Sequence, residues 1–125
     1  MNKINSSKEW RKIFTQRLLK FGVGVIRLAS EFPKTPAGFA IASQLIKAAT
    51  SIGANFVEAQ DASSLKDFIQ KLSISLREAK EANYWLQIVQ MSRLASEASL
   101  SDLIKENNEI IAVLVTSIKS SKLKL

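Results

Sequence analysis

An apolar repeat with alternating spacings of four and three residues is the feature that most restricts how this chain can fold. In the first part of the chain it consists of Phe14, Leu18, Phe21, Val25, Leu28 and Phe32. Such spacing places side chains along one side of an α-helix, in the narrow line that packs against neighbouring helices. A β-strand would instead alternate every second residue. The repeat therefore predicts a helix that belongs to a bundle.

The same repeat occurs in three further segments of the chain. The positions that we expect to face inward are Ile41, Leu45, Ala48, Ile52, Asn55 and Ala59; then Phe68, Leu72, Leu76, Ala79, Asn83 and Leu86; and finally Leu103 or Ile104, Asn107, Ile111, Leu114 and Ile118. Four such segments in 125 residues suit a single domain that spans residues 1–125.

Helix start and stop signals place the boundaries between these segments. The expected N-caps are Ser6, Thr35, Ser64 and Ser99, and the first and third of these open capping boxes that continue to Glu9 and Asp67. Pro33 disfavours helix in the residue before it. We therefore expect helices at about 6–31, 36–59, 65–94 and 100–121. Long helices with short connections predict an all-α protein, an antiparallel up-down-up-down four-helix bundle.

The second helix is unusually apolar, because Lys47 is the only charge between Thr35 and Val57. Three explanations are open. A transmembrane helix is disfavoured, since a central lysine costs about 2.5–3.5 kcal/mol in a bilayer. The helix could be the best-buried one of a monomer, or its second side could contact another subunit. We favour the contact with another subunit.

Apolar residues outside the inward line support that preference, because exposed apolar surface on a small protein usually marks an interface. A broad core-facing stripe is the alternative explanation for them. The expected interface comprises Ala42, Ile46, Ala49, Gly53 and Phe56 of the second helix, with Ile74, Trp85 and Ile88 of the third.

The composition excludes several classes of enzyme. The chain contains no His and no Cys, so histidine-dependent triads, cysteine nucleophiles and the usual zinc ligand sets are ruled out. We therefore expect no enzymatic activity, no cofactor and no metal. The first residues lack the apolar core of a secretory signal, so we expect a cytoplasmic protein that is not bound to a membrane.

Polar residues near the ends of the second and third helices form a second candidate cluster. Glu78 and Glu81 are three residues apart, so that they share a helix face. A carboxylate metal site and a paired-carboxylate hydrolase are two interpretations. We favour a third, in which polar groups are buried and hydrogen-bond across the core to fix the helix register. This set comprises Asn55, Glu58, Glu81 and Asn83.

Positive charge is concentrated in the first half of the chain and in the last residues. The formal net charge is +7. Residues 1–50 hold nine Lys or Arg and two acids, residues 51–118 hold six and nine, and the last seven residues add three lysines. Such a distribution can attract polyanions.

On the first helix the basic residues form a stripe opposite the apolar repeat. A stripe of this kind can neutralise phosphates, although it is also typical of an ordinary solvated face. The predicted nucleic-acid-binding residues are Lys8, Arg11, Lys12, Arg17, Lys20 and Arg27 of the first helix, with Lys119, Lys122 and Lys124 at the C-terminus. RNA or DNA is the expected ligand, and a protein partner is the alternative.

Three stretches resemble a known bacterial family. They read SQLIKAATSIGANFVEA, KDFIQKLSISLREAKEANYWLQIV and NNEIIAVLVTSIKSSK, and the similarity extends from about Trp10 to Lys122. The family consists of four-helix bundles whose founding members are encoded by intervening sequences in large-subunit ribosomal RNA genes. A related branch contains the accessory variability proteins of retroelements. Many members end the second helix with Ser-Ile-Pro-x-Asn-Ile-Ala-Glu-Gly, whereas Gly53 and Ala59 stand here for the proline and the last glycine.

The resemblance implies an up-down bundle that assembles as a homopentamer around a central channel. It implies no catalysis. The retroelement relatives bind RNA or DNA and a reverse transcriptase through a basic exterior. The resemblance therefore favours an oligomeric binding protein, with a protein-interaction scaffold as the alternative.

Overall fold

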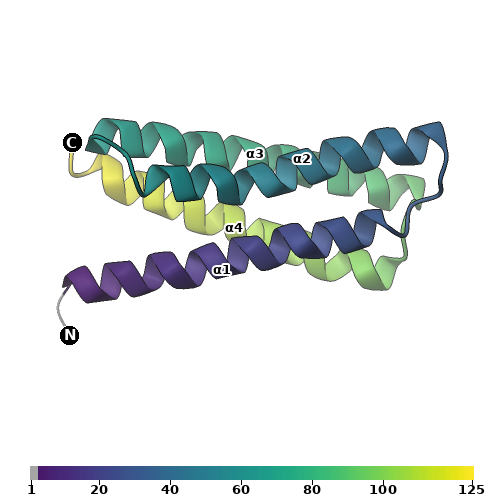
Figure 1. The fold of residues 1–125 in the computed structure, drawn as a ribbon, viewed down its shortest axis with the longest axis horizontal. Coiled ribbons are helices and arrows are strands. Elements are labelled where there is room, and N and C mark those ends of the chain that lie inside the picture. Colours follow the sequence, from purple (N-terminus) through teal and green to yellow (C-terminus); the bar gives the residue numbers. More distant parts are fainter. Residues whose placement is uncertain (1–2) are drawn as a thin grey trace.

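Four α-helices form the fold, and each runs antiparallel to the one before it (Figure 1). The computed structural model describes the backbone of residues 3–125 and the side chains of residues 7–125. The helices are α1 (Lys3–Ala29), α2 (Pro36–Ala59), α3 (Leu65–Ser92) and α4 (Glu97–Lys122). The predicted up-down four-helix bundle is confirmed. Because the helix number is even, α1 begins and α4 finishes at the same end of the bundle.

Side-chain caps define the beginnings of α2 and α3 as predicted. The Thr35 hydroxyl accepts a hydrogen bond from the Gly38 amide at 3.1 Å, and the Ser64 hydroxyl accepts one from the Asp67 amide at 3.1 Å. Each bond satisfies an amide that has no partner inside the helix. The Asp67 carboxylate accepts from the amide of Ser63, at 3.2 Å, and not from that of Ser64 as a standard capping box would have it.

The predicted caps of α1 and α4 are wrong. The helix α1 already begins at Lys3, so Ser6 lies within it, and the Ser6 side chain is outside the described residues. The cap of α4 is Ser96, whose hydroxyl accepts from the Ser99 amide at 3.4 Å. Ser96 offers the same chemistry as Ser99 three residues earlier, and the helix starts at the first suitable serine.

The apolar line of α1 is confirmed at every position, since its six members are at most 5% exposed. The arc that α3 buries is wider than predicted. In addition to Leu72, Ala79 and Leu86, the structure buries Ile69 and Val89. This helix packs against both α2 and α4, and its contact with α2 is the most extensive in the bundle, whereas α1 and α4 meet over the shortest stretch.

The apolar character of α2 follows largely from its place in this single chain, because it contacts α1 on one side and α3 on the other. Ala49 and Phe56 are at most 1% exposed. Their assignment to a surface between subunits is therefore wrong. Over the part of the chain that the structure describes, no helix has a stretch apolar enough to cross a membrane.

The buried polar residues differ from the predicted set. Glu58 and Glu81 are exposed, and Asn83 is half-buried. The Asn55 amide donates to the Ser51 carbonyl of its own helix at 2.8 Å, so it does not bridge helices. These four assignments are wrong, because a helical polar residue on the flank of a core can reach solvent or its own backbone.

Two other polar side chains bridge the helices through the core. The Asn107 amide donates to the Ala79 carbonyl of α3 at 2.9 Å, and the Ser75 hydroxyl donates to the Ile52 carbonyl of α2 at 2.8 Å. Both side chains are fully buried. Asn107 Oδ1, by contrast, has no hydrogen-bond partner in the described part of the chain.

Candidate nucleic-acid interface

Two grooves lie on either side of α1. The first, which we call the α1–α2 groove, has a volume of about 590 Å³ and runs between the outer sides of these two helices. The second, the α1–α4 groove, has a volume of about 570 Å³ and is formed by the first turns of α1 and the last turns of α4, with Phe68 of α3. The grooves are similar in size, and their chemistry differs.

The α1–α2 groove is apolar. Leu19, Val23 and Ile26 of α1 line it and are about half exposed, and Ala54 and Val57 of α2 complete it. Its two threonine hydroxyls, of Thr15 and Thr50, donate to carbonyls of their own helices at 2.8 Å. Among the described residues, Glu58 is the one charged residue in its lining.

The predicted oligomer residues are distributed over two places. Gly53 lines the α1–α2 groove, where a Cβ would lie 3.4 Å from the Leu18 Cβ of α1. The remaining ones are half-buried on the surface, namely Ala42, Ile46, Ile74, Trp85 and Ile88. Their contact with a second subunit stays a prediction.

The sequence analysis missed the α1 contribution to this surface. Leu19, Val23 and Ile26 repeat with four- and three-residue spacing of their own. That spacing could have revealed a second apolar line beside the core-facing one.

An ion pair connects the middle of α1 to α4. Arg17 Nε lies 2.6 Å from Glu106 Oε2, Arg17 Nη2 lies 2.7 Å from Glu106 Oε1, and the same nitrogen lies 2.7 Å from Glu109 Oε2. The hydrogen bond from Arg17, opposed by partial burial, lowers the pKa of Glu106. The hydrogen bond to Glu106 likewise raises the pKa of Arg17. Because two carboxylates already accept hydrogen bonds from its guanidinium, Arg17 is less available to a phosphate than an unpaired cation would be, and its role in phosphate binding stays a prediction.

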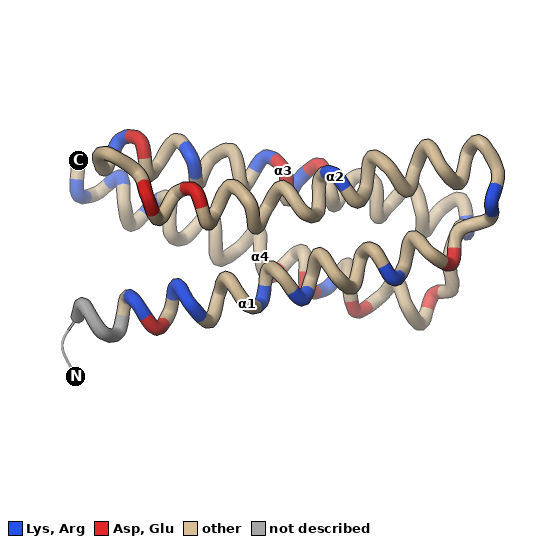
Figure 2. Tube along the Cα trace, in the orientation of Figure 1, with Lys and Arg blue, Asp and Glu red and all other residues tan. Residues whose placement is uncertain are grey.

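The other predicted cations are exposed. On α1 these are Lys8, Arg11, Lys12, Lys20 and Arg27, and near the C-terminus they are Lys119, Lys122 and Lys124. The first half of α1 and the last turns of α4 lie at the same end of the bundle, and blue segments of both appear at the left of Figure 2. We call this group the cationic end: Lys8, Arg11, Lys12, Lys119, Lys122 and Lys124.

Arg27 is separate from the cationic end. It lies sixteen residues after Arg11, which is about 24 Å along a helix. The acidic residues Glu106 and Glu109 of α4 lie beside the intervening part of α1, where they bind Arg17. The two carboxylates therefore offset the positive charge of Arg17 near the middle of α1. Lys20 and Arg27 are exposed, and their contact with phosphate stays a prediction.

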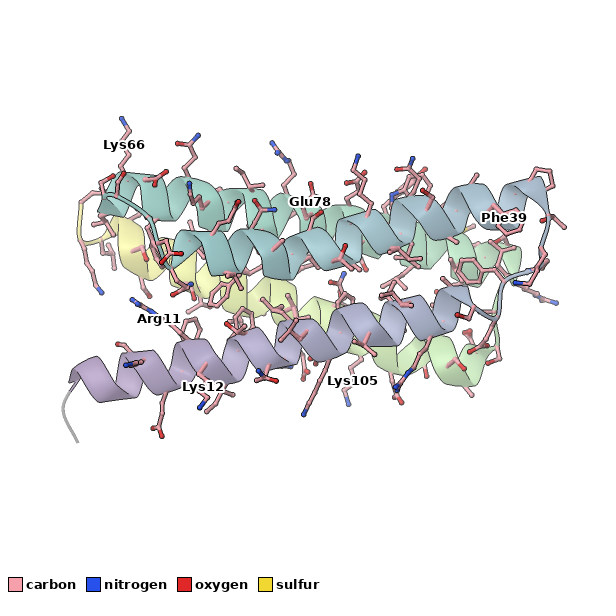
Figure 3. The ribbon with its side chains drawn as sticks, in the orientation of Figure 1. Arg11, Lys12, Phe39, Lys66, Glu78 and Lys105 are labelled. Carbon is pink, nitrogen blue, oxygen red and sulfur yellow. The ribbon has the colours of Figure 1, made fainter. Side chains whose placement is uncertain are left out.

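The α1–α4 groove opens at the cationic end. Arg11 and Lys124 line it, and its lining includes no carboxylate among the described residues. Figure 3 shows Arg11 pointing from α1 toward the other helices, whereas Lys12 points away from them. Trp10, which also lines the groove, stacks on Phe14 with ring centroids 5.5 Å apart and meets Phe56 edge-on at 6.0 Å.

Four hydroxyls of α4 also line this groove, namely those of Thr116, Ser117, Ser120 and Ser121. Elsewhere in the bundle, hydroxyls such as those of Ser30 and Ser73 donate to carbonyls of their own helices. Within the described residues none of the four α4 hydroxyls has such a bond. These hydroxyl groups were not predicted as part of a site, because the sequence of a serine-rich helix end does not indicate which neighbouring helix its side chains face.

Carboxylates do not gather into a metal site in the part of the chain that the structure describes. Glu78 is the carboxyl group whose pKa is raised, first by burial and then by the neighbouring Glu81. The Arg77 and Lys47 side chains oppose that increase. This arrangement offers a mildly perturbed surface carboxyl group.

Comparisons with known proteins agree with this architecture. One solved structure is that of a protein of unknown function from the S23 ribosomal protein family of Bacteroides thetaiotaomicron VPI-5482. It is 31% identical and aligns with a TM-score of 0.80, over 87% of this chain and 97% of that one. No curated protein matches the sequence. The model of the family described as 23S rRNA-intervening sequence protein matches residues 12–116. This match covers most of the bundle and confirms the resemblance seen in the sequence, so the chain belongs to the 23S rRNA-intervening sequence protein family.

Proposed function

We propose that this chain forms a homo-oligomer that binds nucleic acid, with RNA as the expected ligand, and that it catalyses no reaction. The observation that carries the proposal is the cationic end, where exposed lysines and arginines of α1 and α4 lie at the same end of the bundle. Phosphate contacts from such side chains supply most of the sequence-independent affinity of nucleic-acid-binding proteins.

The α1–α2 groove supports the oligomeric part of the proposal. Leu19, Val23 and Ile26 remain about half exposed in a single chain, and contiguous apolar surface of this kind is typical of interfaces. A second copy is the expected occupant, and the family resemblance favours five copies. Each copy would repeat the cationic end, so that one RNA strand could contact several subunits and bind more tightly than to one.

The absence of catalysis is supported by the chemistry of the side chains. The chain has no His and no Cys, and these residues serve most often as general base and activated nucleophile. The carboxylates around α4, namely Glu106 and Glu109, are engaged by Arg17.

A protein-interaction scaffold is the second candidate function. It is favoured by large apolar side chains that are exposed outside both grooves, since Phe39 is 59% exposed and Met91 is 84% exposed. Such a scaffold would associate with a protein partner and would not respond to RNA.

A binding titration tests the proposal. We expect a fluorescently labelled 20-nucleotide single-stranded RNA to bind in an anisotropy assay, and to bind about 50-fold more weakly at 200 mM than at 50 mM salt if four phosphates are contacted. The Lys8→Glu/Lys12→Glu variant should weaken binding at least about tenfold. The matched control, Lys34→Glu/Lys105→Glu, removes two exposed lysines away from the cationic end.

Two results would contradict the proposal. If binding is absent or insensitive to salt, nucleic-acid binding is rejected. If light scattering gives the mass of one 13.8 kDa chain, the oligomeric part is rejected.

A further inference from the structure

We propose that the α1–α4 groove holds one unpaired nucleotide of a single strand, with its base against Trp10 and its phosphate between Arg11 and Lys124. The inference rests on the proposed nucleic-acid binding and assigns to it a specific site and ligand form. It follows from three properties of the groove, which are the hydroxyls and cations in its lining, its fixed aromatic ring and its place at the cationic end.

The lining of the groove suits an anion that also carries hydrogen-bonding groups. Its volume of about 570 Å³ lies in the range of small-ligand sites. Five hydroxyls and two cations line it, without a carboxylate among the described residues.

Ser121 is the most buried of the hydroxyl-bearing residues in the lining, at 8% exposed. Its side chain has no hydrogen bond within the described residues, and its oxygen is not among the buried polar atoms that lack a partner. The hydroxyl is therefore open to solvent in the groove, where a ligand oxygen can take the place of water as its partner.

Trp10 provides a rigid surface for a base. Stacking on Phe14, with an angle of 9° between the rings, and the edge contact with Phe56 hold the indole in place. The residue nevertheless remains 40% exposed. Bases stack on exposed aromatic rings of single-strand-binding proteins whatever their sequence, because every base has a π-face.

A single strand fits this arrangement better than a duplex or an acidic peptide. In a duplex the bases are stacked on one another, and only unpaired bases can be turned outward onto a protein ring. An acidic peptide would satisfy Arg11 and Lys124 but would leave the aromatic surface unused. Both of these alternatives give distinct outcomes in the test below.

Tryptophan fluorescence provides the test. The chain has two tryptophans, so the Trp85→Phe variant makes Trp10 the sole tryptophan emitter. We expect an eight-nucleotide single-stranded RNA of mixed sequence to quench this emission saturably. A duplex of the same sequence, or a poly-glutamate peptide at equal concentration, should leave it unchanged.

Matched variants locate the binding to the groove. Ser120→Glu places a negative charge in the lining, whereas Ser101→Glu places one at an exposed position of α4 outside it. In the Trp85→Phe background we expect Ser120→Glu to weaken binding at least about tenfold more than Ser101→Glu, from the loss of one phosphate contact and added repulsion. Trp10→Leu, followed by anisotropy, should weaken binding about fivefold to a hundredfold. Circular dichroism melts check that each variant is folded.

The outcomes separate this inference from the broader proposal. If anisotropy shows that RNA binds but Trp10 emission is not quenched, and Ser120→Glu and Ser101→Glu have the same affinity for RNA, the groove assignment is overturned and nucleic-acid binding stands. If duplex or peptide quenches Trp10 as well as the single strand does, the ligand assignment is overturned. If no RNA binds to the unmodified chain, both proposals fail.

Discussion

The two grooves beside α1 differ in chemistry although they are nearly equal in volume, about 590 Å³ and 570 Å³. In the α1–α2 groove the hydroxyls are satisfied by their own helices, and the exposed surface is hydrocarbon. In the α1–α4 groove the hydroxyls of α4 are left open beside Arg11 and Lys124. The first can gain free energy only by excluding water, whereas the second can bind a polar ligand.

The difference shows how one helix can serve two kinds of contact. The α1 helix packs more extensively on α2 than on α4, and the α1–α2 groove lies along the outer side of that contact. On the α4 side an ion pair at Arg17 replaces much of that packing, and the first turns of α1 remain separated from α4 by the groove. The three predictions below test whether this difference holds.

The largest expected effect is on assembly. Val23→Glu places a charge in the α1–α2 groove, and burying it against a second copy would be strongly unfavourable. We expect light scattering after size exclusion to show a fall from an oligomer to the 13.8 kDa chain. The control is Gln16→Glu, which changes an exposed position of α1 outside this groove. An unchanged mass for Val23→Glu would show that the apolar groove is not the interface.

A smaller effect is expected at the ion pair between α1 and α4. Glu106→Gln should lower the free energy of unfolding by about 1 kcal/mol at pH 7, a modest amount because both partners are partly exposed to solvent. Since the pKa of Glu106 in the folded chain lies below its usual 4.5, the contribution is present above about pH 4.5 and is lost as the pH falls through the folded value.

Urea unfolding at pH 7 and at pH 3, at one protein concentration, measures this difference. The control is Asp102→Asn, another exposed carboxylate of α4. The variant and the unmodified chain should converge at low pH. A difference that stays constant from pH 7 to pH 3 would mean that the pair does not act through its charge.

The smallest effect compares two glycines of α1. A Cβ at Gly22 would lie 3.6 Å from Thr50 Cγ2, an ordinary contact, whereas one at Gly24 would lie 3.0 Å from Leu103 Cδ2 of α4. Because alanine favours the helix over glycine, Gly22→Ala should stabilise the chain by about 0.5–1 kcal/mol. At Gly24→Ala the required shift of Leu103 should cancel the gain. Thermal or urea unfolding of both variants gives the comparison, and equal stabilisation would contradict the difference in spacing.

Local patterns in the sequence were sufficient for the fold. Every member of the first four-three repeat is buried, and the pair Thr35-Pro36 located the start of α2. Such signals act over a few residues, so they can be read without knowing which helices are neighbours. The caps at Ser6 and Ser99 failed because other positions nearby could begin the helix equally well.

The site was less predictable because it depends on the distance between helices. Phe56 and Ala49 were expected on an outer surface, yet α1 covers that side of α2. Arg17 was expected to bind phosphate like the other basic residues of α1, and only the arrangement of α4 brings Glu106 to it. Trp10 and Ser121 belong to one groove although they lie at opposite ends of the chain.

The buried amide of Asn107 has a consequence for the uniqueness of the bundle. It donates to the Ala79 carbonyl while its own oxygen has no partner among the described residues. If α4 were rotated so that this position faced an apolar side chain and not the Ala79 carbonyl, the amide would lose its acceptor inside the core, at a cost that a leucine at the same place would not incur. Asn107 thus penalises misaligned packings, as a single buried asparagine does in coiled coils.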